Sequence, residues 1–164
     1  MLILSHKIFL KHNDERFVNT ELLMKKIRIL EHTADIAVEV FAGDIEHLFI
    51  FAAEAWLTAV ADTEKAASDE ERDIMLSSSS LEVLLVDFLS ELNYLLNTKK
   101  WIYLDTEKIS IKQNGKFTLI AKVKGTKLNK NNVKLKTEIK AITFHQMNIE
   151  KIENGFITKI IFDI

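Results

Sequence analysis

The sequence contains no cysteine, no proline and only four glycines among its 164 residues. Without cysteine, the chain can form no disulfide, no thiolate metal site and no cysteine nucleophile. The scarcity of proline and glycine argues against a proline-rich linker, a collagen-like segment or a long flexible hinge. No apolar run reaches the length of about 18 residues that a membrane-spanning helix requires. These absences predict a compact domain that works in a reducing compartment, the cytoplasm, away from membranes.

The chain also lacks a large excess of charge of either sign. It has 22 Lys and Arg residues and 24 Asp and Glu residues, which give a net charge of −2. The chain as a whole is therefore not expected to attract a polyanion. Residues 122–140 depart from this balance, with seven lysines and a single acid, Glu138. This Lys122–Lys140 stretch fits either a solvated strand face with its loop or the phosphate-facing patch of an RNA-binding or chaperone-like module. Aromatic residues that could stack on bases are absent from the stretch.

Two helices are expected from periodic apolar residues and their caps. The first begins after Asp44, whose side chain suits an N-cap, and runs to about Val60. Ser79, followed three residues later by Glu82, matches a capping box and predicts the start of the second helix. Leucines recur on a broad apolar face as far as Leu96, so this second helix should be packed on more than one side.

Most of the remaining sequence has strand character, apart from an acidic connector at residues 61–73. Apolar residues predict strands at Ile27–Ile29, Ile36–Phe41, Ile74–Leu76, Ile109–Ile111, Phe117–Val123, Ile139–Met147, Ile149–Ile152 and Phe156–Ile164. Asn114-Gly115 and Asn154-Gly155 are typical of hairpin turns. Two helices among many strands that are mostly joined by hairpins indicate an α+β fold with a mostly antiparallel sheet.

Residues 1–23 differ from the rest of the chain. Their first apolar run is interrupted by His6 and Lys7, which is not typical of a secretory signal. We expect residues 1–23 to be an N-terminal extension and residues 24–164 to be the single domain. Translation from Met24, directly before the first clear strand pattern, is the alternative.

The usual catalytic signatures are missing. The sequence has no glycine-rich phosphate loop, no H-E-x-x-H motif and no G-x-S-x-G nucleophile elbow. The serines at 77–80 fit a loop and a helix cap better than a nucleophile. His145 lies at an alternating position of its expected strand, which predicts a half-buried histidine, and Met147 is expected in the core.

Two acidic segments stand out. Residues 31–35 (EHTAD) lie between two strand patterns, and residues 162–164 (FDI) end the chain directly after an apolar run. Turn chemistry explains the first segment and an exposed terminus explains the second. Alternatively, the oxygen atoms of the first segment suit a hard cation such as Ca²⁺ or Mg²⁺. Asp163 and the adjacent terminal carboxylate would likewise favour a cation.

The sequence resembles the archease family. The resemblance is carried by residues 29–36 (ILEHTADI), residues 137–145 (TEIKAITFH) and the terminal residues 162–164 (FDI), with a further match in the helix at 48–53. It covers about residues 25–164. The combination of these blocks at opposite ends of one small domain is specific, and it implies an archease-like single domain.

The resemblance implies a metal site. In the family, the aspartate of the first block, the penultimate aspartate and the terminal residue bind the metal, and these are Asp35, Asp163 and Ile164 here. The expected ion is calcium, with Mg²⁺ or Mn²⁺ as alternatives. Four further side chains are expected to support the metal or to meet the partner, namely Glu31, His32, Lys140 and His145.

The resemblance also implies a function without an active site of its own. Archeases are protein cofactors of the tRNA-splicing RNA ligase, which joins RNA ends bearing 2′,3′-cyclic phosphate or 3′-phosphate to 5′-hydroxyl ends. They promote the metal-dependent guanylylation of that ligase by GTP and its multiple turnover, so RNA would be an indirect partner. A metal-dependent phosphoester hydrolase built from Asp35, His32, Asp163 and His145 is a further alternative.

The sequence departs from the family pattern in one loop. Members often carry a Lys-His pair where this chain has Asn132 and Val133, and often an aspartate where it has Gln146. Lys130 or Lys134 could restore the lost charge. These departures weaken any role for that loop and leave the three expected metal ligands untouched.

Overall fold

The structure is a computed structural model, and it describes residues 26–31, 35–64, 66–128 and 133–164, with the backbone alone for 26–31. The expected extension at residues 1–23 and the alternative start at Met24 lie outside these ranges. The elements are β1 (Lys26–Glu31), β2 (Asp35–Ala42), α1 (Ile45–Val60), β3 (Ala61–Asp62), β4 (Glu70–Ser78), α2 (Leu81–Asn97), β5 (Trp101–Asn114), β6 (Lys116–Lys127), β7 (Lys134–Leu135), β8 (Ala141–Thr143), β9 (Ile149–Ile152) and β10 (Gly155–Asp163).

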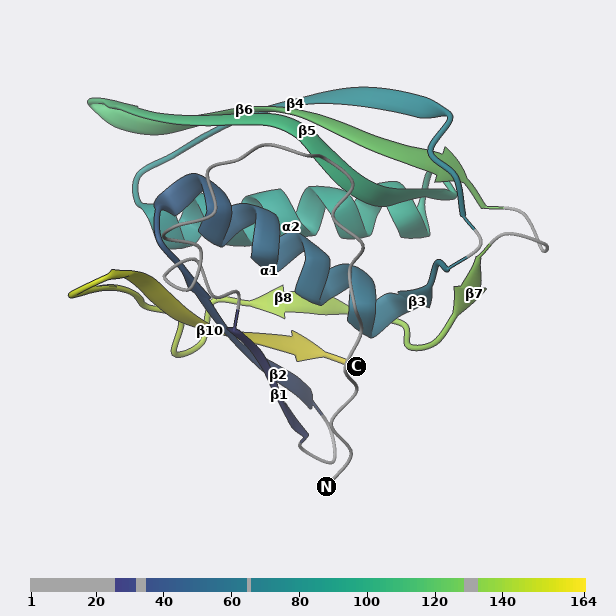
Figure 1. Cartoon of the computed structure of the whole chain (residues 1–164), viewed down its shortest axis with the longest axis horizontal. Helices are drawn as coiled ribbons and strands as arrows, with labels where there is room; N and C mark the ends of the chain where they lie inside the picture. Colours follow the sequence, from purple (N-terminus) through teal and green to yellow (C-terminus); the bar gives the residue numbers. More distant parts are fainter. Residues whose placement is uncertain (1–25, 32–34, 65, 129–132) are drawn as a thin grey trace, which may run out of the picture.

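The two helices lie between two antiparallel sheets (Figure 1). One sheet has the strand order β1-β2-β10-β8, and β9 pairs with the first half of β10. The other sheet has the order β4-β6-β5, and β3 pairs with β7 as a separate ribbon. This architecture confirms the predicted α+β fold, with two main helices and mostly antiparallel strands. Neither helix of the described residues is long and apolar enough to cross a membrane.

The core is formed where α1 and α2 meet the inner faces of the sheets. Trp56 of α1 is fully buried, and its indole Nε1 donates to Asn93 Oδ1 of α2 over 3.3 Å. The amide Nδ2 of Asn93 donates in turn to the carbonyl oxygen of Ile139 over 2.9 Å. Asn93 therefore joins both helices to the segment that leads into β8, a role that its place in an apolar helix pattern did not reveal.

The predicted start of α1 is confirmed, whereas the predicted start of α2 is wrong by one residue. The N-cap of α2 is Ser80, whose Oγ accepts the N–H of Val83 over 3.2 Å. Glu82 is thus in the second helical position, from which it does not close a capping box. Its carboxylate instead accepts the N–H of Ile149 at the start of β9 over 3.1 Å.

The shifted cap predicts different effects for two neighbouring serines. Ser80→Ala should lower the free energy of unfolding by about 1 kcal/mol, because one N–H at the start of α2 loses its acceptor. Ser79→Ala, at an exposed position just before the cap, is the matched control and should change it by less than about 0.5 kcal/mol. Urea unfolding of both variants measures the difference, and equal effects would contradict the assignment of Ser80 as the cap.

Two strand predictions also need correction. The expected strand Ile139–Met147 is reduced to β8, because the chain leaves the sheet after Thr143 and turns, with Gln146 at a φ of 59°. His145 lies in this turn and is exposed, so its predicted half-buried position is wrong, whereas Met147 is buried as predicted. The predicted connector 61–73 ends early, because β4 already begins at Glu70. Both errors arise where pairing with distant strands overrides the local pattern.

Candidate metal centre

Two of the predicted ligands, Asp35 and Asp163, occupy directly opposite positions. Asp163 ends β10 and is paired with Asp35 at the start of β2. Directly opposed residues of antiparallel strands have Cβ atoms about 4.5–5.5 Å apart and project from the same face of the sheet. Two carboxylates at such positions repel each other unless a cation lies near them. The structure thus brings together two acids from opposite ends of the sequence.

The face on which these two carboxylates lie follows from strand alternation. In β10, Ile160 and Phe162 are fully buried in the core, and in β2 Val38 has the same role. Because successive side chains of a strand point to opposite faces, Asp163 and Asp35 lie on the face of the sheet that is turned away from the helices. Both are half-buried and retain contact with solvent.

The C-terminus belongs to the same place. Ile164 follows Asp163 directly, and its half-buried side chain packs against the core. On the other side of β10, Asp163 pairs with Ala141 of β8, and the N–H of Lys140 donates to the carbonyl oxygen of Asp163 over 2.8 Å. Asp163 is therefore held by strands on both sides of β10, and Ile164 directly after it is half-buried rather than exposed.

Lys140 supplies positive charge to this group of acids. Its Nζ donates to a main-chain oxygen of Ile164 over 2.9 Å. Together, Asp35, Asp163 and the terminal carboxylate of Ile164 contribute three negative groups, and Lys140 is the ammonium group that bonds to one of them. We call Asp35, Asp163 and the terminal carboxylate of Ile164 the carboxylate cluster.

The carboxylate cluster has the donor chemistry of a hard-cation site. All its donors are oxygens, which suit Ca²⁺, Mg²⁺ or Mn²⁺. Within the described ranges, no three His, Asp or Glu side chains are grouped as a metal site. Among the described groups, the terminal carboxylate of Ile164, next to Asp163, offers a further oxygen ligand.

The other predicted site residues have different positions. Glu31 is opposite Ile36 at the end of β1, but its side chain and His32 lie outside the described part of the structure. His145 follows the end of β8 that pairs with Ile161, which is the end away from Asp163. The fold places Lys140 next to the carboxylate cluster, and no described contact joins His145 to it.

Three of the seven lysines in the stretch at residues 122–140 are paired with acids. Its β6 lysines lie beside acidic residues of β4 and β5, and the ion pairs are Lys122 with Glu71 at 3.6 Å, Lys124 with Glu107 at 2.9 Å and Lys127 with Glu70 at 3.3 Å. The hydrogen bond from Lys124 lowers the pKa of Glu107 and raises the pKa of Lys124 itself. Each exposed pair adds little stability. Together, however, they offset three of the seven positive charges on which a phosphate-facing patch would depend.

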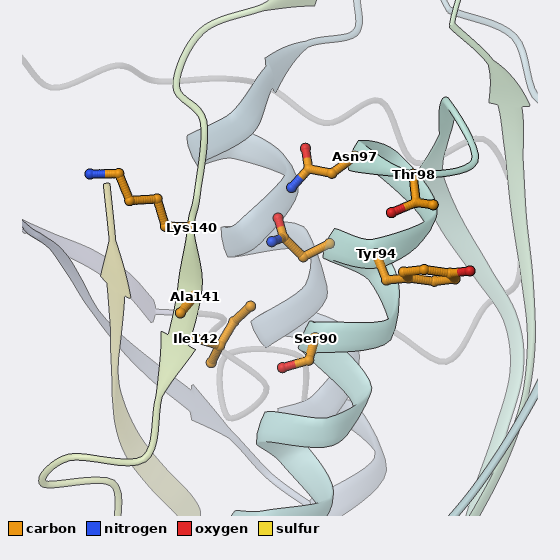
Figure 2. Close-up of a pocket in the computed structure, with 8 residues that line it drawn as sticks. Ser90, Tyr94, Asn97, Thr98, Lys140, Ala141 and Ile142 are labelled. Atoms are coloured by element: carbon orange, nitrogen blue, oxygen red, sulfur yellow. The ribbon is translucent and has the colours of Figure 1, made fainter.

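A groove of about 330 Å³ lies between α2 and β8, beside the candidate metal centre. It is lined by Ser90, Asn93, Tyr94, Asn97, Thr98, Lys140, Ala141 and Ile142. The side chain of Lys140 points away from α2 and toward the end of β10 (Figure 2). Among the described residues that line the groove there is no carboxylate and no imidazole. Asp35, Asp163 and His145, the described residues named for the hydrolase alternative, do not line this groove.

Comparison with known proteins identifies similar sequences. The sequence model of the Archease protein family (MTH1598/TM1083) matches residues 28–164. A Protein archease from Methanosarcina mazei is 36% identical over 141 residues, which cover 85% of this chain and 97% of that protein. A Protein archease from Archaeoglobus fulgidus is 32% identical over 139 residues, covering 85% of this chain and 99% of that protein.

Two solved structures have a similar fold. The solution structure of Methanobacterium thermoautotrophicum protein 1598 has a TM-score of 0.74 and 27% identity, and the match covers 86% of this chain and all of that one. The crystal structure of an archease from Thermotoga maritima, described as a possible chaperone, has a TM-score of 0.56 and 27% identity. That match covers 84% of this chain and 96% of the other.

Proposed function

This chain belongs to the archease family, and we propose that it is a non-enzymatic protein cofactor of the tRNA-splicing RNA ligase. That ligase joins RNA ends bearing 2′,3′-cyclic phosphate or 3′-phosphate to 5′-hydroxyl ends, after it has taken guanylate from GTP onto a histidine. The cofactor promotes this guanylylation and restores turnover after each round. Its cysteine-free sequence suits the cytoplasm, where we place this role.

The observation that carries the proposal is the pairing of Asp35 with Asp163 beside the C-terminus. Two opposed carboxylates cost stability, so a fold that carries them gains most when a cation is present. We propose that Asp35, Asp163 and the carboxylate of Ile164 hold a divalent cation, with Ca²⁺ as the first choice and Mg²⁺ or Mn²⁺ as alternatives. A cation of this kind supplies positive charge that stabilises phosphoryl groups and a pyrophosphate leaving group.

The chain's own contribution is to present these acids to a partner. Asp35 and Asp163 lie on the sheet face turned away from the helices, and both remain half-exposed. The strand ends are held by β8 through the bond from the N–H of Lys140 to Asp163. A carboxylate cluster that is partly exposed at the ends of two strands can approach the active site of a ligase, which suits a cofactor that acts repeatedly.

The two alternative functions have less support. An RNA-binding module would rely on the lysine-rich stretch, but Lys122, Lys124 and Lys127 are already paired with acids. A hydrolase would need a base and a nucleophile beside the carboxylate cluster. In the part of the chain that the structure describes, His145 does not meet this need, because it follows the end of β8 that lies away from Asp163.

The test is to mix the protein with its cognate ligase, GTP and divalent metal, with the cofactor below the concentration of the ligase. We expect more guanylylated ligase and several ligated products per ligase molecule, because a cofactor that is not consumed acts on many ligase molecules. The protein without ligase is the control and should neither ligate RNA nor hydrolyse phosphoesters. Unchanged guanylylation and unchanged turnover would contradict the proposal. Ligase-independent RNA binding that weakens steeply with salt would favour the RNA-binding alternative.

A further inference from the structure

We propose that Lys140 is a built-in counter-ion of the carboxylate cluster and that it weakens the binding of the divalent cation, so that the metal is held exchangeably. This inference rests on the proposed metal site, and it assigns to one lysine the control of its affinity. A cofactor that serves a partner repeatedly needs a metal that can leave, and a resident ammonium group is a simple means to that end.

The geometry that supports this role is direct. Lys140 precedes β8, and its Nζ donates to a main-chain oxygen of Ile164 over 2.9 Å. The side chain leaves the groove beside α2 and reaches over the end of β10 (Figure 2). Its backbone N–H holds the carbonyl oxygen of Asp163 over 2.8 Å, so the position of the lysine relative to the cluster is set by the main chain.

The charges explain the direction of the effect. Three carboxylates lie at the end of the strand pair, and the ammonium group of Lys140 offsets one of their negative charges. A divalent cation that binds Asp35, Asp163 and the terminal carboxylate must accept a positive neighbour or displace it from the oxygen it occupies. Both outcomes cost binding free energy, because like charges at short distance repel most strongly where the groups are partly shielded from water.

A lysine at this place could instead act only by holding the terminal carboxylate in position. The two roles differ in sign: loss of a positioning contact weakens metal binding, whereas loss of a competing cation strengthens it. The sign of the change therefore decides between them. We commit to competition because the bonded oxygen belongs to the residue whose carboxylate the metal needs.

The experiment is calorimetric titration of the metal-free full-length protein with CaCl₂. Lys140→Met removes the charge and keeps the aliphatic stem, so Ca²⁺ should bind at least about tenfold more tightly than to the wild type. Lys140→Arg keeps the charge and should bind Ca²⁺ as the wild type does. Lys136→Met is the matched control, because this lysine bonds the carbonyl oxygen of Thr58 instead and should leave Ca²⁺ affinity unchanged.

A second measurement is the melting temperature in EDTA. Lys140→Met should melt at a lower temperature than the wild type when no metal is present, since the cluster then lacks its counter-ion. Lys140→Arg, which keeps the positive charge, should melt at the wild-type temperature. Equal or weaker Ca²⁺ binding by Lys140→Met, with binding by the wild type, would overturn this inference alone. Failure of both proteins to bind Ca²⁺ would overturn the metal site itself, and with it the role of Lys140.

Discussion

Asp35→Asn and Asp163→Asn variants are expected to lose stimulation of the ligase while they keep or slightly gain stability. Each substitution removes one of two directly opposed carboxylates. Relief of this repulsion in the metal-free protein should raise the free energy of unfolding by up to about 1 kcal/mol. The proposed cation, however, loses a charged oxygen ligand in either variant, so Ca²⁺ binding and the acceleration of guanylylation should both fall at least tenfold. The two aspartates would then serve the proposed function at the expense of stability.

Three measurements check this expectation together: denaturant unfolding, calorimetric titration with CaCl₂ and the rate of ligase guanylylation. Asp73→Asn is the matched control, because Asp73 is an exposed aspartate on β4, opposite Lys122 of β6 and in the other sheet. It should stimulate the ligase as the wild type does. Full stimulation by both the Asp35 and the Asp163 variants would refute the assignment, and so would a loss of activity that is explained by unfolding.

The second large effect concerns the interior, where Asn93→Leu should destabilise the fold by about 3 kcal/mol or more. Asn93 is 7% exposed, and its amide satisfies both the indole N–H of Trp56 and the carbonyl oxygen of Ile139. Trp56 and Ile139 are themselves buried, so neither group can turn to water after the substitution. Each buried polar group that loses its partner costs about 1–3 kcal/mol, and two are left here.

Urea unfolding of Asn93→Leu measures this cost, with Asn97→Leu as the control. Asn97 lies one turn further along α2, lines the same groove and is exposed, so its substitution should change stability by less than about 0.5 kcal/mol. A loss below 1 kcal/mol for Asn93→Leu would mean that the two hydrogen bonds are not needed by the core. Because Ile139 directly precedes Lys140, the Asn93 variant should also weaken the pairing of β8 with the end of β10.

Several elements could be predicted because their causes are local. Asp44 caps α1 as expected, since its side chain accepts the N–H of His47 three residues later over 2.8 Å. Asn114 and Gly115 join β5 to β6, where Gly115 has the positive φ of 73° that the turn requires. Period-two alternation likewise identified β2 and β10. For the cap and the turn, the decisive contacts lie within a few residues along the chain, and for the two strands the signal is the local alternation of apolar residues.

Other predictions were wrong where a distant partner decided the outcome. Glu82 was expected to close a capping box, but β9 presents the N–H of Ile149 to its carboxylate. His145 was expected on a strand, but β10 pairs with only three residues before it and the chain then turns. Asn93 had no distinguishing local signal, because its importance depends on Trp56 and Ile139, which are far from it in the sequence.

The sequence by itself determined the fold class, the boundaries of α1, the central hairpin and the family to which the chain belongs. It also contained the two acidic segments, although local chemistry left turn and metal-site interpretations open. Only the tertiary structure set Asp35 opposite Asp163 and turned Lys140 toward Ile164. The physical reason is that the register of β2 against β10 follows from burying Val38, Ile160 and Phe162 against the helices. Packing of the inner face therefore decides which charges meet on the outer one.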